Sequence, residues 1–94
     1  MKYVERIRKM ILDQMQQEAV NVYLFGSWAR GTQRRGSDVD IAIKFQGENK
    51  PWKIAELREI LEESTIPYNV DVVDMNNASE GILQEIQKDG IKWK

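Results

Sequence analysis

The sequence predicts one small α/β (α+β) domain in which helices pack on a mixed sheet of three to four strands. Three segments carry apolar residues at helical spacing, and three shorter segments carry the apolar alternation or runs typical of strands. Along the 94 residues they follow the order helix, strand, loop, strand, helix, strand, helix. No internal repeat, low-complexity stretch or linker divides the chain, so residues 1–94 are expected to form a single domain.

The first half of the chain predicts a helix followed by two strands. An amphipathic helix is expected over residues 2–18, because its apolar side chains recur every three or four positions. Residues 20–25 are largely apolar on both faces, which indicates a central strand. Residues 26–37 contain three glycines and no apolar period, so they are expected to be a loop, with one helical turn after Ser27 as a possibility. The apolar stripe of the helix comprises Val4, Ile7, Ile11 and Met15.

The second strand is expected over residues 38–45, where apolar and polar residues alternate. A helix over residues 52–64 follows a polar turn, and Pro67 ends that region. Residues 69–74 predict a third strand.

The C-terminal region predicts a last helix with recognisable ends. Asn77 with Glu80 resembles a capping box, and Gly90 stands where a C-cap glycine is expected. Ile91 and Trp93 are expected to add a short edge strand.

Composition excludes several kinds of chemistry. The chain has no cysteine and no histidine, so any metal site must use carboxylates, which favour hard ions such as Mg²⁺. Its 14 basic and 15 acidic residues give a net charge of −1, which argues against direct nucleic-acid binding. No apolar run is long enough for a membrane and the N-terminus lacks a signal-peptide core, so we expect a cytoplasmic protein without membrane contact.

Three carboxylates form the candidate catalytic and metal site. Asp38 and Asp40 are two residues apart on a predicted strand, so both side chains leave the same face. Asp71 lies in another predicted strand, and all three converge if the two strands are neighbours. A cluster of like charges needs a cation, which points to Mg²⁺. The alternative is that Asp38 and Asp40 belong to the solvated face of an amphipathic strand.

The glycine-rich loop is the candidate phosphate site. Gly26 has no side chain, so a phosphate can approach its backbone, and Ser27 offers a hydroxyl and a backbone N–H. Arg30 is a candidate for a phosphate contact or for a brace of the loop. The alternative is an ordinary connection between strands that carries surface arginines.

These residues together resemble a known signature. Gly26-Ser27-Trp28-Ala29-Arg30-Gly31, five further residues and then Ser37-Asp38-Val39-Asp40 are similar to the G-S-x-A-R-G-x5-S-D-x-D pattern of the nucleotidyltransferase superfamily related to DNA polymerase beta. The resemblance is to the minimal nucleotidyltransferase (MNT) domains and covers essentially the whole chain.

The resemblance implies a nucleotidyltransferase fold and a role for each signature residue. Asp38, Asp40 and Asp71 would hold Mg²⁺, in two ions, with Asp71 also helping to deprotonate an acceptor hydroxyl. ATP would be the substrate, held by Gly26 and Ser27, with Arg30 and Ser37 as further nucleotide contacts.

The resemblance also implies a partner. Minimal nucleotidyltransferases pair with HEPN-domain toxins, so the expected activity is transfer of AMP to a toxin tyrosine, with the chain acting as antitoxin in a hetero-oligomer. Two alternatives stay open. One is a non-catalytic antitoxin that neutralises its partner by complex formation, and the other is a nucleotidyltransferase acting on a small-molecule antibiotic.

Overall fold

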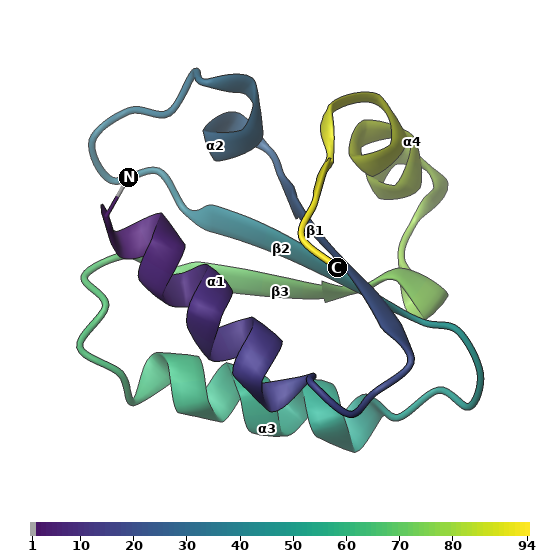
Figure 1. Ribbon diagram of the computed structural model, residues 1–94. Coiled ribbons are helices and arrows are strands. Elements are labelled where there is room, and N and C mark those ends of the chain that lie inside the picture. The colour runs from purple at the N-terminus through teal and green to yellow at the C-terminus, as the bar shows by residue number, and fades with distance from the viewer. Residues whose placement is uncertain (1) are drawn as a thin grey trace.

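A four-stranded mixed sheet organises the chain, in agreement with the predicted fold class (Figure 1). The computed structural model describes residues 2–94. The strand order is β3-β2-β1-β4, with β1 antiparallel to β2 and β4, and β2 parallel to β3. The elements are α1 (Lys2–Gln14), β1 (Val20–Phe25), α2 (Ser27–Arg30), β2 (Val39–Phe45), α3 (Pro51–Glu62), β3 (Val70–Asp74), the 3₁₀ helix η1 (Met75–Asn77), α4 (Glu80–Asp89) and β4 (Ile91–Lys92).

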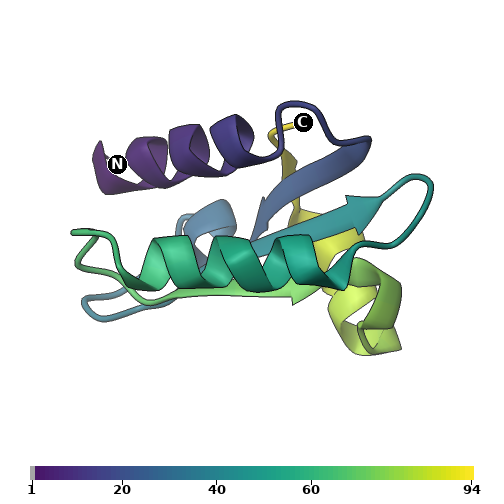
Figure 2. The same ribbon diagram turned by 90° about the horizontal axis from the view of Figure 1, so that it is seen from below.

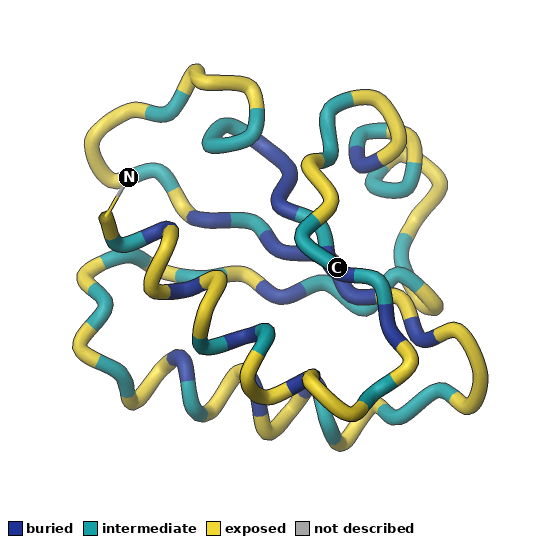
Figure 3. The backbone as a smooth tube through the Cα atoms, in the orientation of Figure 1, coloured by how far each residue is buried: buried dark blue, intermediate teal, exposed yellow. Residues whose placement is uncertain are grey.

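The larger core lies where α1 and α3 cover one face of the sheet (Figures 1 and 2). The buried residues in Figure 3 follow the strands and the inward sides of these two helices. Apolar area removed from water here is the main stabilising contribution to the fold. The α1 and α3 side chains in this core are Val4, Ile7, Ile11, Ile54, Leu57 and Leu61.

A smaller cluster lies on the opposite face of the sheet, under α4. In Figure 2, α1 lies above the strands and α4 below them. Phe25 of β1, Ala42 of β2 and Ile86 of α4 are buried together there. This second face also carries Asp40, because side chains two apart on a strand share a face.

Helix α1 is shorter than predicted. It ends at Gln14, whereas the apolar period predicts a helix to residue 18. Met15 stays buried, but the next position of the apolar stripe is Glu18. Because Glu18 is polar, a further helical turn would bury no apolar side chain. The backbone instead turns, with Glu18 N–H donating to the Met15 carbonyl at 3.1 Å.

The capping-box prediction at Asn77 is wrong. Ser79 is the N-cap of α4, and its Oγ accepts a hydrogen bond from Ile82 N–H at 3.3 Å. Asp74 accounts for the difference, because its carboxylate accepts hydrogen bonds from Asn76 N–H and from the Asn77 side chain. These bonds hold Asn77 in η1, before the helix begins.

The predicted end of α4 at Gly90 is confirmed, but the glycine has an ordinary φ of −65°. A Cβ at this position would lie 2.4 Å from the Ile86 carbonyl oxygen. Close packing, and not a left-handed turn, therefore favours glycine there. The expected C-terminal edge strand is confirmed as β4.

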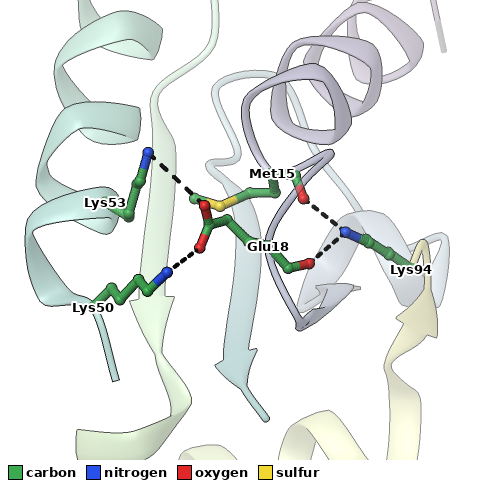
Figure 4. Close-up of polar contacts among 5 residues, drawn as sticks. All are labelled: Met15, Glu18, Lys50, Lys53 and Lys94. Carbon is green, nitrogen blue, oxygen red and sulfur yellow. Dashed lines mark hydrogen bonds and ion pairs between the residues drawn. The ribbon is translucent and has the colours of Figure 1, made fainter. Parts of the chain in front are cut away.

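Lys94 joins the end of the sheet to the turn between α1 and β1 (Figure 4). Its Nζ donates to the carbonyls of Met15 and Glu18 at 2.7 and 2.8 Å. The Glu18 carboxylate accepts from Lys50 at 2.8 Å and lies 3.9 Å from Lys53. The hydrogen bond from Lys50 lowers the pKa of Glu18 below its usual value. This cluster connects three segments at one end of the molecule.

Among residues 2–94, no helix has the length and apolar character that crossing a membrane requires.

We expect Ile43→Ala to lower the free energy of unfolding by about 2–5 kcal/mol, because Ile43 is fully buried in β2 and truncation leaves a cavity. Urea unfolding followed by tryptophan fluorescence measures the change. Ile91→Ala is the matched control, since 46% of Ile91 is exposed, and it should cost far less. Equal losses in the two variants would contradict this description of the core.

Candidate active site

The parallel pairing of β2 with β3 brings two of the three predicted carboxylates side by side. Asp40 and Asp71 are register partners across the pair, so the two strands are neighbours, which was the condition for their carboxylates to converge. Asp38 precedes β2 and is exposed. Because β1 runs antiparallel to β2, the C-terminal end of β1 lies beside the start of β2, where Phe25 pairs with Asp40. Gly26 follows directly.

Gly26 packs against the Asp40 carboxylate. A Cβ on Gly26 would lie 2.2 Å from Asp40 Oδ2 and 3.1 Å from its Cγ, so any side chain here displaces Asp40. The backbone φ of 75° at Gly26 also lies in the left-handed region that L-residues avoid. Glycine is therefore required at this position by its backbone conformation and by its close packing against the Asp40 carboxylate.

Ser27 begins the short helix α2, which confirms the possible helical turn in the predicted loop. Ala29 and Arg30 N–H groups both donate to the Gly26 carbonyl at 3.1 Å. The helix ends at Gly31 in the left-handed conformation, and Thr32 N–H donates to the Ser27 carbonyl at 3.0 Å. These bonds hold the Gly26–Ser27 backbone at the C-terminal end of β1, beside Asp40. A phosphate contact for Gly26 and Ser27 remains a prediction.

Arg30 braces α2 against α4. Its Nη1 lies 3.0 Å from Glu85 Oε1 and 3.7 Å from Asp89 Oδ2. Of the two roles considered for Arg30, the structure shows the brace, and the nucleotide contact remains a prediction. Glu85 itself was missed by sequence reasoning, although the spacing of Glu85 and Asp89 places both on one face of a helix.

Ser37 closes the loop that leads into β2. Its Oγ accepts a hydrogen bond from Arg34 N–H at 2.8 Å, and its carbonyl accepts from Trp28 Nε1 at 3.4 Å. The Trp28 ring meets Tyr68 edge to face at 5.2 Å between centroids, so Trp28 has a packing role. A nucleotide contact for Ser37 remains a prediction beside this structural role.

Asp40 lies in an unfavourable environment for a negative charge. Burial, together with the nearby carboxylates of Asp71, Asp38 and Glu85, raises its pKa to about 6, and Arg30 acts in the opposite direction. The ionised form of Asp40 therefore gains free energy from any cation that joins this cluster.

The three aspartates supply the oxygen ligands that a hard divalent cation such as Mg²⁺ prefers. Within residues 2–94, however, no three acidic side chains lie close enough to form a ready-made metal cage. Carboxylates of like charge gain free energy from separation when nothing neutralises them. The donor set and the raised pKa of Asp40 fit a cation that draws these side chains together.

Comparison with known proteins identifies the family of the chain. The sequence profile of the family described as polymerase beta, nucleotidyltransferase matches residues 5–92. Protein adenylyltransferase MntA from Shewanella oneidensis is 38% identical over 69 residues, which cover 73% of this chain and 49% of that protein. This chain thus spans about half the length of that relative.

Two solved structures share the fold. The structure of a toxin–antitoxin with AMP-PNP has a TM-score of 0.74 at 30% identity, covering 93% of this chain and 72% of the other. A complex of tri-AMPylated Shewanella oneidensis HEPN toxin with MNT antitoxin has a TM-score of 0.68 at 26% identity, covering 98% and 69%. The architecture described above is therefore a nucleotidyltransferase fold.

We expect Gly26→Ala to destabilise the protein by about 1 kcal/mol more than Gly31→Ala. Both glycines have a φ of 75°, so the backbone strain is the same, but only at Gly26 does the new methyl meet Asp40. Denaturant unfolding of the two variants measures the difference. If the two variants lost equal stability, the close packing of Gly26 on Asp40 would be wrong.

Asp40 should make stability fall as pH rises from about 4 to about 6. Its pKa in the folded protein is raised from 3.8 to about 6, so the folded state binds more protons than the unfolded state in this window. Asp40→Asn should remove this slope and stabilise the protein at pH 7 by about 1 kcal/mol, allowing for screening of a half-exposed carboxylate. Urea unfolding at several pH values tests this, and an unchanged slope in Asp40→Asn would contradict it.

Proposed function

Because this chain belongs to the polymerase beta nucleotidyltransferase family, we propose that it transfers AMP from ATP to a hydroxyl acceptor. In this proposal the acceptor is a tyrosine of a partner HEPN-domain toxin, and the chain acts as an antitoxin. Support comes from the relatives: one is named a protein adenylyltransferase, and one solved complex pairs an MNT antitoxin with a tri-AMPylated HEPN toxin.

The observation that carries the proposal is the pairing of Asp40 with Asp71 beside Gly26. Carboxylates that hold a cation and a backbone that admits a phosphate are the two requirements of a triphosphate site. Two aspartates with only a structural role would be more stable farther apart, because like charges repel. Here the pairing of two strands holds them adjacent. The intact set also favours catalysis over a non-catalytic antitoxin.

Each residue then has a role in positioning or in proton transfer. Gly26 and Ser27 receive the terminal phosphates, while Arg30 and Ser37 keep the loop in place. Asp38, Asp40 and Asp71 hold Mg²⁺, which when bound supplies neutralisation of the triphosphate charge.

In the reaction, the acceptor oxygen bonds to the α-phosphorus, the bond to pyrophosphate breaks, and the hydroxyl proton passes to Asp71. The contribution of the protein is positioning and charge stabilisation. The raised pKa of Asp40 supports a site that binds substrate together with a cation.

We expect wild-type protein to bind ATP in calorimetry only when Mg²⁺ is present. The variant Asp38→Asn/Asp40→Asn should weaken this binding by about 10- to 100-fold, because it removes two ligand charges. Asp74→Asn is the matched control: Asp74 belongs to the same strand as Asp71 but caps η1, so ATP affinity should be unchanged.

A transfer assay separates catalysis from binding. Wild-type chain, a HEPN-domain toxin, Mg²⁺ and ATP labelled in the α-phosphate should yield labelled toxin, and mass spectrometry should locate AMP on tyrosine. Asp71→Asn should reduce the transfer rate by about 100-fold or more. A stable complex with the toxin but no transfer by wild-type chain would contradict the catalytic proposal and favour a non-catalytic antitoxin.

A further inference from the structure

Helix α4 holds Arg30 through one nitrogen of its guanidinium. Arg30 Nη1 donates a hydrogen bond to Glu85 Oε1 at 3.0 Å and lies 3.7 Å from Asp89 Oδ2. Every nitrogen of an arginine side chain carries N–H donors, and within residues 2–94 neither Nε nor Nη2 of Arg30 makes a hydrogen bond. The ion pair therefore anchors the guanidinium and leaves donors for another acceptor. Because 39% of the Arg30 side chain is exposed, a ligand from solvent can reach it.

The carboxylate that holds Arg30 stands on a rigid support. Glu85 precedes Ile86 on α4, and Ile86 is buried in one cluster with Phe25 of β1. Phe25 is the residue directly before Gly26. Groups carried by packed helices are held more precisely than groups on loops. Helix α4 therefore gives the guanidinium a fixed anchor beside the loop that starts at Gly26.

The ion pair lies beside the candidate phosphate site. Arg30 is the last residue of α2, and its backbone N–H donates to the Gly26 carbonyl at 3.1 Å. Besides burial and the other aspartates, Glu85 raises the pKa of Asp40 and Arg30 lowers it, so both charges lie near this carboxylate. Gly26 packs directly on the same carboxylate. A phosphate received at Gly26 is therefore close to a long cationic side chain on the same short helix.

Phosphate oxygens suit the remaining donors of this guanidinium. Arginine binds phosphate through parallel N–H groups of its planar fork, and it keeps its charge at every physiological pH. A long side chain that its ligand must first order opposes binding, whereas one that is already held does not. The anchoring of Arg30 by Glu85 therefore strengthens phosphate binding without any contact between Glu85 and the ligand.

We infer that Glu85 is a positioning residue of the nucleotide site: it holds Arg30 by Nη1 so that Nε and Nη2 donate to a terminal phosphate of ATP. The inference rests on the proposed function, since it concerns the ATP of that reaction. Glu85 touches no substrate. Its effect on the affinity for ATP passes through Arg30.

The first test compares Glu85→Asp with the wild-type full chain, because the shorter side chain keeps its charge but loses its reach to Nη1. Calorimetry with Mg²⁺ and ATP should show binding about three- to tenfold weaker in Glu85→Asp, which is the cost of ordering a free arginine side chain. In an Arg30→Gln background the same change should have no effect. Glu80→Asp is the matched control: it makes the same shortening at an exposed position of α4 and should leave ATP affinity unchanged.

Side-chain NMR separates a phosphate contact from an ion pair that only braces α2. In isotope-labelled wild-type chain, the Nε–H group of Arg30 should be ordered before ligand is added, and its signal should shift saturably with Mg²⁺ and ATP. In Glu85→Asp the same group should be mobile before ATP is added. An Arg30 that served only as a brace would give a signal that bound ATP does not shift.

Three results would overturn the inference: a mobile Arg30 Nε–H group in the free wild-type protein, a signal that bound ATP leaves in place, or ATP binding by Glu85→Asp that is as tight as in wild type or tighter. Tighter binding would mean that Glu85 withholds Arg30 from the phosphate. Each of these results can occur while wild-type protein binds ATP and transfers AMP, and the proposed function then stands. Only a wild-type protein that fails to bind ATP with Mg²⁺ would overturn both together.

Discussion

The pairing of β2 with β3 is the constraint on which the rest of the structure depends, because it holds two carboxylates adjacent against their repulsion. The apolar side chains of the same strands bury against α1 and α3, and this burial stabilises the register that opposes Asp40 to Asp71. One face of β2 thus stabilises the sheet, while the other carries the destabilising charges. Because the charges and the larger core lie on different faces of β2, a chain of 94 residues can hold like-charged side chains beside a well-packed core.

The loop after β1 shows how a single residue satisfies several demands at once. At Gly26 the chain leaves the sheet with a left-handed φ, starts α2 through hydrogen bonds to its own carbonyl, and lies against Asp40. Arg30 then ties α2 to α4 through Glu85, so the loop is supported from the second face of the sheet. The sequence motif is therefore a unit of structure as well as a set of ligands.

Local pattern predicts the strands and the motif well, because alternation in residues 20–25 and 38–45 reports directly which side chains are buried. The adjacency of Asp40 and Asp71 needs a further assumption, since no local signal says which strands pair. Contacts distant in sequence were missed for the same reason, as with Glu85 and Arg30. The start of α4 was mispredicted because side chains compete to form local hydrogen bonds. Asp74 accepts a hydrogen bond from the Asn77 side chain, so Ser79 and not Asn77 caps α4.

The cluster around Lys94 has a consequence for the time course of folding. Lys94 bonds to carbonyls 76 and 79 positions earlier in the chain, and β4 pairs with β1 over a similar separation. Contacts between such distant positions require closure of long loops and form slowly. During synthesis, α1 and the first strands emerge well before Lys94 does, so the bonds from Lys94 to the turn at Met15 form after those segments are present. The contacts that Lys94 makes beside β1 are therefore among the slow ones to form.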